Sequence, residues 1–153
     1  MTILSLNKNY QQQEMIRFRI IASSDNENDQ TLKRKIVKNL KEELTYSKAT
    51  TLEEEREYIQ KKLPTFKEKI EETLKEEQDE RSYEIHYGMN YFPEKEYQGT
   101  TYEEGNYESL VVTLGEGKGE NFWCILFPPL CMVDEEEDIE YKSFIKEALS
   151  KIF

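Results

Sequence analysis

Histidine, cysteine and tryptophan are scarce in this sequence: its 153 residues include one, two and one of them, respectively. A single histidine, His86, excludes a metal site that needs several imidazoles from one chain. A closed zinc site would have to add distant carboxylates to the two cysteines, which is not the usual structural combination. No segment approaches the roughly 20 apolar residues of a membrane-spanning helix. We therefore expect neither a metal nor a cofactor.

Basic residues are also few, with 21 Lys and Arg against 32 Asp and Glu and a net charge of −11. Binding to nucleic acid is driven by Lys and Arg that release counterions, so this charge argues against a nucleic-acid partner. It also disfavours an anionic membrane surface. Apolar content is a modest 37%, but ten Tyr and seven Phe supply large apolar side chains. A folded domain with a charged exterior is therefore expected.

The beginning of the sequence differs from the rest. Residues 1–14 are polar and are predicted to be a flexible lead-in, followed by a single domain over residues 15–153. The lead-in lacks the apolar core and the small-residue cleavage site of a signal peptide. Taken alone, that absence favours a cytoplasmic protein.

The first strand and the first helix have clear patterns. Alternation of apolar and basic residues over 15–22 predicts a half-buried strand. Asn26 is a good helix N-cap, with Asp29 three residues later. The apolar stripe of this predicted helix repeats every four residues and comprises Leu32, Ile36, Leu40 and Leu44.

Two more helices are predicted before the next strand. Thr51 and Glu54 form a capping-box pattern that opens the first of them. Pro64 is expected to stop or kink this helix, because proline lacks the amide hydrogen and disfavours helical geometry in the preceding residue. It also suits the first turn of a third helix. The stripe of that third helix would be Phe66, Ile70 and Leu74.

Beyond residue 82 the apolar period becomes two. Strands are predicted from Tyr83 to Tyr91, from Tyr107 to Leu114 and from Phe122 to Phe127, the last being apolar on both faces. A final amphipathic helix carries Tyr141, Ile145, Ala148, Leu149 and Ile152. The order β-α-α-α-β-β-β-α predicts an α+β fold, with a mainly antiparallel sheet of about four strands and helices packed on it.

Three glycines, Gly115, Gly117 and Gly119, surround Lys118 and invite comparison with a phosphate-binding loop. Such a loop needs backbone amides at the start of a helix, whereas this one contains Glu116 and runs into a strand. A tight turn between strands is the favoured interpretation.

The only Trp, both Cys and the only Pro-Pro pair lie within residues 115–134. The aromatic residues there could simply be core. Two successive prolines remove two ladder donors, however, so the segment from Phe127 to Leu130 must leave the sheet. Cys124 and Cys131 would be bridged in an oxidising compartment and would be two buried thiols in a reducing one. A rigid apolar surface of this kind is typical of a protein interface.

The segment 114–131 resembles the signature of the stage II sporulation protein R family of endospore-forming bacteria. Segments 19–33, 87–99 and 105–110 resemble further motifs of that family, so the likeness covers about residues 15–150. It implies a non-enzymatic signal, secreted from the forespore into the space between the two sporulating cells. There it would trigger a membrane-embedded aspartic protease of the mother cell to process the precursor of sigma factor E. The family also implies an export segment, which this sequence does not contain.

Our leading hypothesis is therefore a signalling protein that reaches the membrane only through its protease partner. The proposed partner-binding residues are Trp123, Phe127, Pro128, Pro129 and Leu130, clamped by a Cys124–Cys131 disulfide and joined by Ser24, Asp25 and Asp29. One alternative is a hydrolase acting on cell-wall material, which would need two facing carboxylates, one with a raised pKa. Another is a scaffold protein, which would expose a large self-complementary apolar patch.

Overall fold

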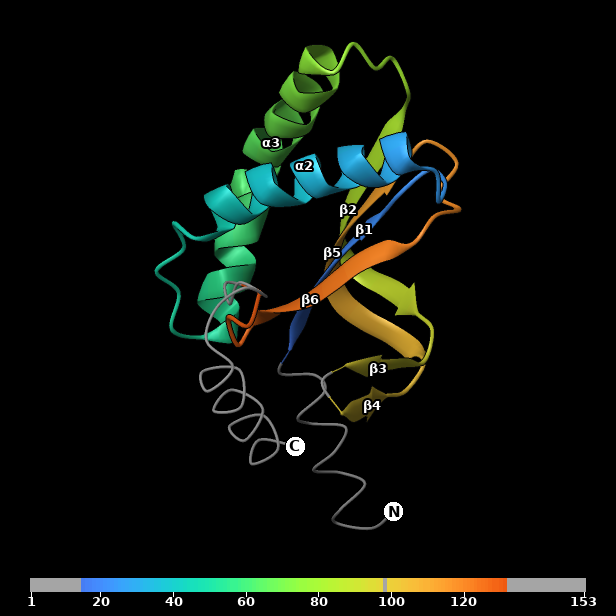
Figure 1. The fold of residues 1–153 in the computed structure, drawn as a ribbon. Coiled ribbons are helices and arrows are strands. Elements are labelled where there is room, and N and C mark those ends of the chain that lie inside the picture. The colour runs from blue at the N-terminus through green and yellow to red at the C-terminus, as the bar shows by residue number, and fades with distance from the viewer. Residues whose placement is uncertain (1–14, 98, 132–153) are drawn as a thin grey trace.

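The computed structural model describes residues 15–97 and 99–131 (Figure 1). Its central sheet has the spatial order β2-β5-β1-β6. These strands are β1 (Ile16–Ile21), β2 (Tyr83–Phe92), β5 (Gly105–Leu114) and β6 (Asn121–Phe127). β1 and β5 run parallel, while the other two pairings are antiparallel. The predicted α+β class and the mainly antiparallel four-stranded sheet are confirmed. The predicted final helix lies outside the described residues.

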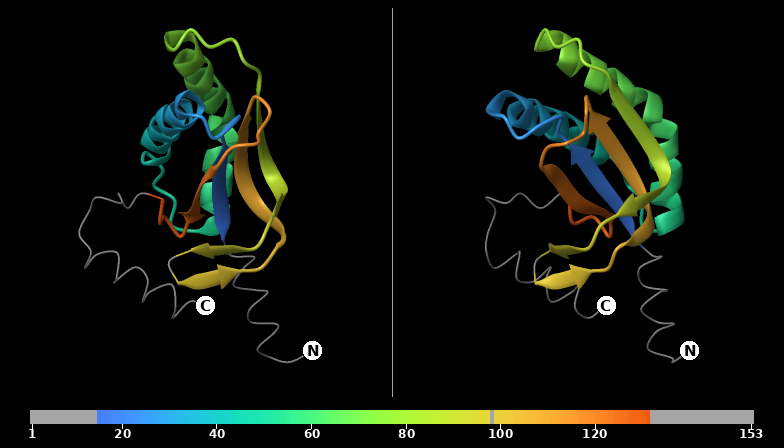
Figure 2. Two further views of the ribbon diagram at one scale, coloured as in Figure 1. Left: turned by 45° about the vertical axis from the view of Figure 1, so that its right-hand side comes forward. Right: turned by 90° about the vertical axis from the view of Figure 1, so that its right-hand side faces the viewer.

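Two helices, α2 (Glu27–Leu44) and α3 (Leu52–Glu76), cover one face of the sheet (Figures 1 and 2). Both predicted N-caps are confirmed. The Asn26 side chain accepts a hydrogen bond of 2.8 Å from the Asp29 amide, and the Thr51 side chain accepts one of 3.1 Å from the Glu54 amide. The carboxylate of Glu54 bonds to the Thr50 amide rather than closing the box on Thr51. Neither of these described helices is long and apolar enough to cross a membrane.

Pro64 neither ends a helix nor begins one, so the prediction of three helices before β2 is wrong. It lies inside the continuous 25-residue helix α3. Pro64 and Gln60 are both exposed, so the carbonyl that loses its helical partner can be hydrated. Ile59 and Phe66 are fully buried on the opposite side of the helix. Their packing on the sheet holds the helix together on both sides of the proline.

A two-stranded hairpin, β3 (Lys95–Tyr97) and β4 (Thr100–Tyr102), follows β2 and was not predicted. Tyr102 of this hairpin packs in a second apolar cluster with Phe92, Trp123 and Ile125. The helices pack on the main core, which contains Phe18 and its neighbours on the same face of the sheet. Helices thus cover one face of the sheet, while the hairpin region covers only part of the other face, at one end of the sheet (Figure 2).

Candidate functional site

Strand β6 positions the Trp-Cys segment at an edge of the main sheet. It pairs with β1, with Trp123 opposite Arg19 and Cys124 opposite Phe18. Successive side chains of a strand point to opposite faces. Cys124 therefore enters the helix-side core, whereas Trp123 enters the second cluster. The prediction that Phe122 to Leu126 form a buried strand is confirmed for the four residues from Trp123 onward, and Phe122 is half-buried.

The two cysteines lie where a disulfide requires them to be. Their Cα atoms are 5.2 Å apart and their sulfur atoms are at bonding distance. Both side chains are buried. The amides of Cys131 and Leu130 donate to the Ile125 carbonyl at 2.9 and 3.1 Å. The chain after β6 therefore folds back and is fastened to the end of its own strand.

The segment Phe127 to Leu130, called the tip from here on, presents a narrow apolar surface. Within it only Pro129 is exposed, and the other three residues are half-buried. Phe127 packs against the helix-side core and Leu130 against the second cluster. Because Phe127 and Leu130 each pack on one of the two apolar clusters, the exposed Pro129 between them is held in a fixed position.

Trp123 lies deeper than an outward-facing anchor would. Its side chain is 9% exposed, and its ring centre is 5.4 Å from that of Tyr102. The indole therefore packs between β6 and the hairpin. A partner that binds the tip would reach this ring only at its margin.

Ser24, Asp25 and Asp29 lie together at the opposite end of β6 from the tip. Ile16, at the start of β1, is opposite Phe127, whereas Ile21, at its end, is opposite Asn121. The Asp25 carboxylate accepts the Glu120 amide at 2.7 Å, just before β6 begins. The structure thus gathers the predicted site residues into two groups and does not bring the two groups together.

The second group is built around a shared arginine. Asp29 accepts a hydrogen bond from the Ser24 hydroxyl at 2.6 Å and one from Arg81 at 2.7 Å. Arg81 also pairs with Asp79 at 2.7 Å. The Ser24 hydroxyl, followed by Arg81, lowers the pKa of Asp29, and Arg81 lowers that of Asp79. These two carboxylates are held ionised, the opposite of the general acid that a glycoside hydrolase needs.

The glycine turn between β5 and β6 has no free amides to offer a phosphate. Gly115 and Gly117 have φ of 52° and 63°, as the predicted turn requires. All six backbone N–H groups from residue 115 to residue 120 donate within the protein. Three of their acceptors belong to residues 22 and 23 at the end of β1. The turn therefore fastens the loop after β1, and the interpretation as a phosphate cradle is rejected.

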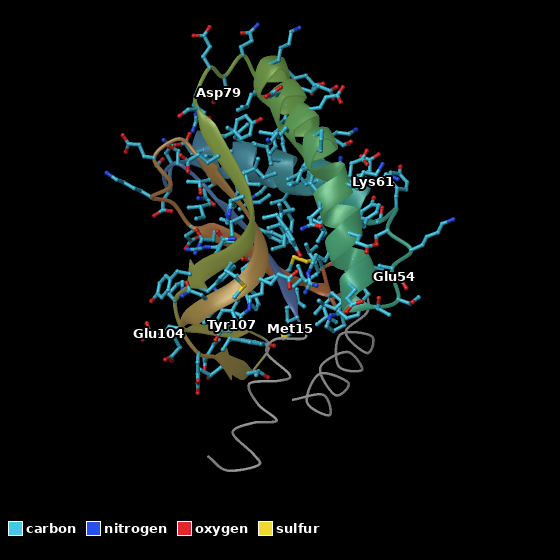
Figure 3. All side chains as sticks on the ribbon, turned by 180° about the vertical axis from the view of Figure 1, so that it is seen from behind. Met15, Glu54, Lys61, Asp79, Glu104 and Tyr107 are labelled. Atoms are coloured by element: carbon cyan, nitrogen blue, oxygen red, sulfur yellow. A yellow bond between two sulfur atoms is a disulfide. The ribbon has the colours of Figure 1, made fainter. Side chains whose placement is uncertain are left out.

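Metal-binding groups do not gather in the described ranges, where no cluster of three or more His, Cys, Asp or Glu could hold an ion. His86 is exposed on β2, with its Nδ1 2.8 Å from the amide oxygen of Asn90. One open hollow is lined by residues that include Asp79 and Arg81, and another by residues that include Glu54 and Lys61. Figure 3 labels Asp79, Glu54 and Lys61.

Sequence reasoning missed a buried arginine next to Trp123. Arg17 of β1 is fully buried, and its guanidinium carbon lies 3.6 Å from the Tyr107 ring centre. The rings of Phe92, Tyr102 and Trp123 lie within 5.3–5.7 Å of it. Its nitrogens make no hydrogen bond of good geometry within the described residues, and burial lowers its pKa more than the neighbouring Tyr107 raises it. The alternation predicted a half-buried strand, which is wrong for Arg17, because the face of β1 that carries this residue is buried as well. Nothing in the sequence showed that aromatic rings would enclose it.

A second missed feature joins α3 to the sheet. Arg56 donates two hydrogen bonds of 2.8 Å each to Glu108 of β5. The hydroxyl of Tyr87 on β2 donates to the same carboxylate. Burial opposes ionisation of Glu108, but the bonds from Arg56 and Tyr87 outweigh it and lower the pKa. Partners separated by 52 residues in sequence leave no local signal that could have revealed this pair.

Comparison with known proteins gives two matches. The family model for stage II sporulation protein R matches residues 12–137. The stage II sporulation protein R of Bacillus subtilis (strain 168) is 40% identical over 137 residues. That alignment covers 83% of this chain and 61% of the relative, so the chain spans less than two thirds of the length of that protein. No solved structure matches.

Proposed function

Because the chain belongs to the stage II sporulation protein R family, we propose that it is a secreted signal of sporulation. It leaves the forespore and acts in the space between the two cells. Its target is the membrane-embedded aspartic protease of the mother cell that processes the precursor of sigma factor E. The chain performs no catalysis itself and is held at the membrane by this partner.

The observation that carries this proposal is the clamped tip. The exposed Pro129 belongs to an apolar segment that is held in place by the cysteine pair and by two backbone hydrogen bonds. A surface ordered before binding loses little conformational entropy when a partner covers it. We therefore assign first contact with the protease to Pro129 and the adjoining parts of Phe127 and Leu130.

Activation through such a contact is a shift of populations. The signal must bind the active arrangement of the protease more tightly than the inactive one, most simply by stabilising a protease dimer. Moving such an equilibrium from about 1:99 to 99:1 needs roughly a 10⁴-fold difference in affinity. Such a difference requires a well-packed contact, which a rigid apolar tip is suited to make.

The test of the tip is cleavage of the sigma precursor by the protease reconstituted in vesicles. Pro129→Ala should reduce activation by about tenfold or more, because removal of a central anchor costs roughly 1.4 kcal/mol or more. Pro64→Ala is the matched control, since this proline is also exposed but lies on α3. Normal activation by the Pro129 variant, with the fold checked by circular dichroism, would exclude the tip as the contact.

A further inference from the structure

The second half of β2 forms an unpaired edge of the sheet. β2 pairs with β5 alone, in an uninterrupted register over all ten residues. The Gly115 amide bonds to the Ser82 carbonyl, so Ser82 and Gly115 are a hydrogen-bonded pair of this ladder. Such pairs recur every second residue in an antiparallel ladder. The main-chain groups of Met89 and Tyr91 therefore point away from β5, toward the free edge.

This edge is exposed and carries large side chains. Met89 and Tyr91 are 62% and 56% exposed, although they share a face of the sheet with the buried and half-buried residues of the helix side. No other segment in the described ranges bonds to the outward main-chain groups of these two residues. Natural edge strands are usually protected by a lysine, a proline or a bulge. Residues 87–91 contain none of these.

Acidic residues lie at both ends of β2. Figure 3 labels Asp79 near one end and Glu104 near the other. Glu80 and Glu84 belong to the first end, and Glu94, Glu96 and Glu104 follow the second. The Tyr91 hydroxyl donates to Glu104 at 2.7 Å, which places this carboxylate beside the edge. Arg81 is already paired with Asp29 and Asp79, and Arg56 with Glu108. Lys75 lies beside Glu80 at the first end, and Lys95 follows the second, where the acids outnumber it. Antiparallel pairing of two copies would set one acidic end against the other.

We propose that the edge of β2 from Tyr87 to Tyr91 accepts an extended basic segment of another protein as an added strand. Main-chain hydrogen bonds to Met89 and Tyr91 supply the pairing, and their side chains contact alternate apolar residues of the incoming segment. Lysine or arginine on that segment complements the acids at both ends. This surface is separate from the tip, and the proposal does not depend on the proposed function.

The test uses a capped peptide of about nine residues with alternating valine and lysine, long enough to span the edge. It is titrated into the isotope-labelled protein while amide hydrogen exchange is followed by NMR. Exchange at the Met89 and Tyr91 amides should slow on binding, whereas Asn90, already bonded to β5, should not change. The same peptide with glutamate for lysine should not bind. Peptide binding without slower exchange at these two amides would overturn the proposal.

Two substitutions at Tyr91 separate the contribution of its main-chain amide to peptide binding from that of its side chain. Tyr91→Pro removes the outward amide and should weaken peptide binding about tenfold or more, whereas Tyr91→Ala keeps the amide and should stay within about threefold. Equal weakening by both would overturn strand addition. If Tyr91→Pro does not fold, the exchange measurement on the unaltered protein decides alone. Dimers of the free protein that bury this edge in sedimentation and exchange experiments would show that a second copy, and not a basic partner, occupies it.

Discussion

The guanidinium carbon of Arg17 lies 3.6 Å from the ring centre of Tyr107, on the face of the sheet that carries no helix. Stacking on an aromatic ring is worth about 2 kcal/mol when the cation is desolvated. Burial of guanidinium donors without hydrogen-bond partners costs more than that. The charge of Arg17 therefore opposes folding, while its long side chain fills the space between the sheet and the hairpin.

Replacement of Arg17 separates these two contributions. Arg17→Met keeps most of the volume and removes the charge, so its free energy of unfolding should equal or exceed that of the unaltered protein by up to about 3 kcal/mol. Arg17→Ala leaves a cavity and should lose about 2–4 kcal/mol. Urea denaturation at pH 7 measures both. A Met variant that is less stable than the unaltered protein would mean that the aromatic rings stabilise the cation more than burial penalises it.

The Asp29–Arg81 pair predicts a loss of stability in acid. The pKa of Asp29 is lower in the folded protein than in the unfolded chain, where it is about 3.9. Its contribution is therefore complete above that value and is lost as the pH falls through the folded pKa. Asp29→Asn should lower the free energy of unfolding by about 1–3 kcal/mol at pH 7 and by progressively less as the pH falls through the folded pKa of Asp29.

Urea denaturation at several pH values measures this difference. Glu116→Gln is the control, because the Glu116–Lys118 pair is 74% and 77% exposed and such pairs contribute little. An equal deficit for Asp29→Asn at both ends of the pH range would show that the loss does not arise from the charge of Asp29.

The cysteine pair predicts a redox-dependent stability. Closing a loop as short as the one between Cys124 and Cys131 is expected to stabilise the fold by about 2–3 kcal/mol. Reduction, or the double substitution of both cysteines by alanine, should lower the unfolding temperature by several degrees. Mass spectrometry after thiol alkylation reports whether the bridge is present. Two free thiols in protein prepared under oxidising conditions would contradict the clamp.

Pro64 predicts a gain in stability. Alanine at this position supplies the missing amide to the Gln60 carbonyl inside a continuous helix, so Pro64→Ala should raise the free energy of unfolding by about 1–3 kcal/mol. Thermal denaturation followed by circular dichroism measures the change. A loss of stability would indicate that the proline sets a bend on which the packing of α3 depends.

Local patterns predicted the local structure well. The cap at Asn26 and the glycine turn depend on neighbours within a few residues, and both are confirmed. Alternation correctly predicted the strand β1 but not the burial of Arg17 on its other face. Pro64 was misjudged because tertiary packing on both sides of it overrides the local penalty of a proline. The hairpin was missed because its strands are only three residues long and one carries two charges.

The site was harder to predict than the fold. Which face of β6 is covered depends on the hairpin, so the sequence could not show that Trp123 is 9% exposed while Pro129 is exposed. Separation of the tip from Ser24, Asp25 and Asp29 likewise follows from the pairing of β6 with β1. No sequence pattern within either segment shows how β6 is aligned with β1.

The rate of sigma-precursor cleavage with and without this protein tests most directly the proposal that it activates a protease. The protease and the precursor are reconstituted in vesicles, and the protein is added from outside over a range of concentrations. A saturable increase in the cleavage rate, absent when the catalytic aspartate of the protease is replaced, is the predicted result. A cleavage rate that does not change at any concentration would contradict the account.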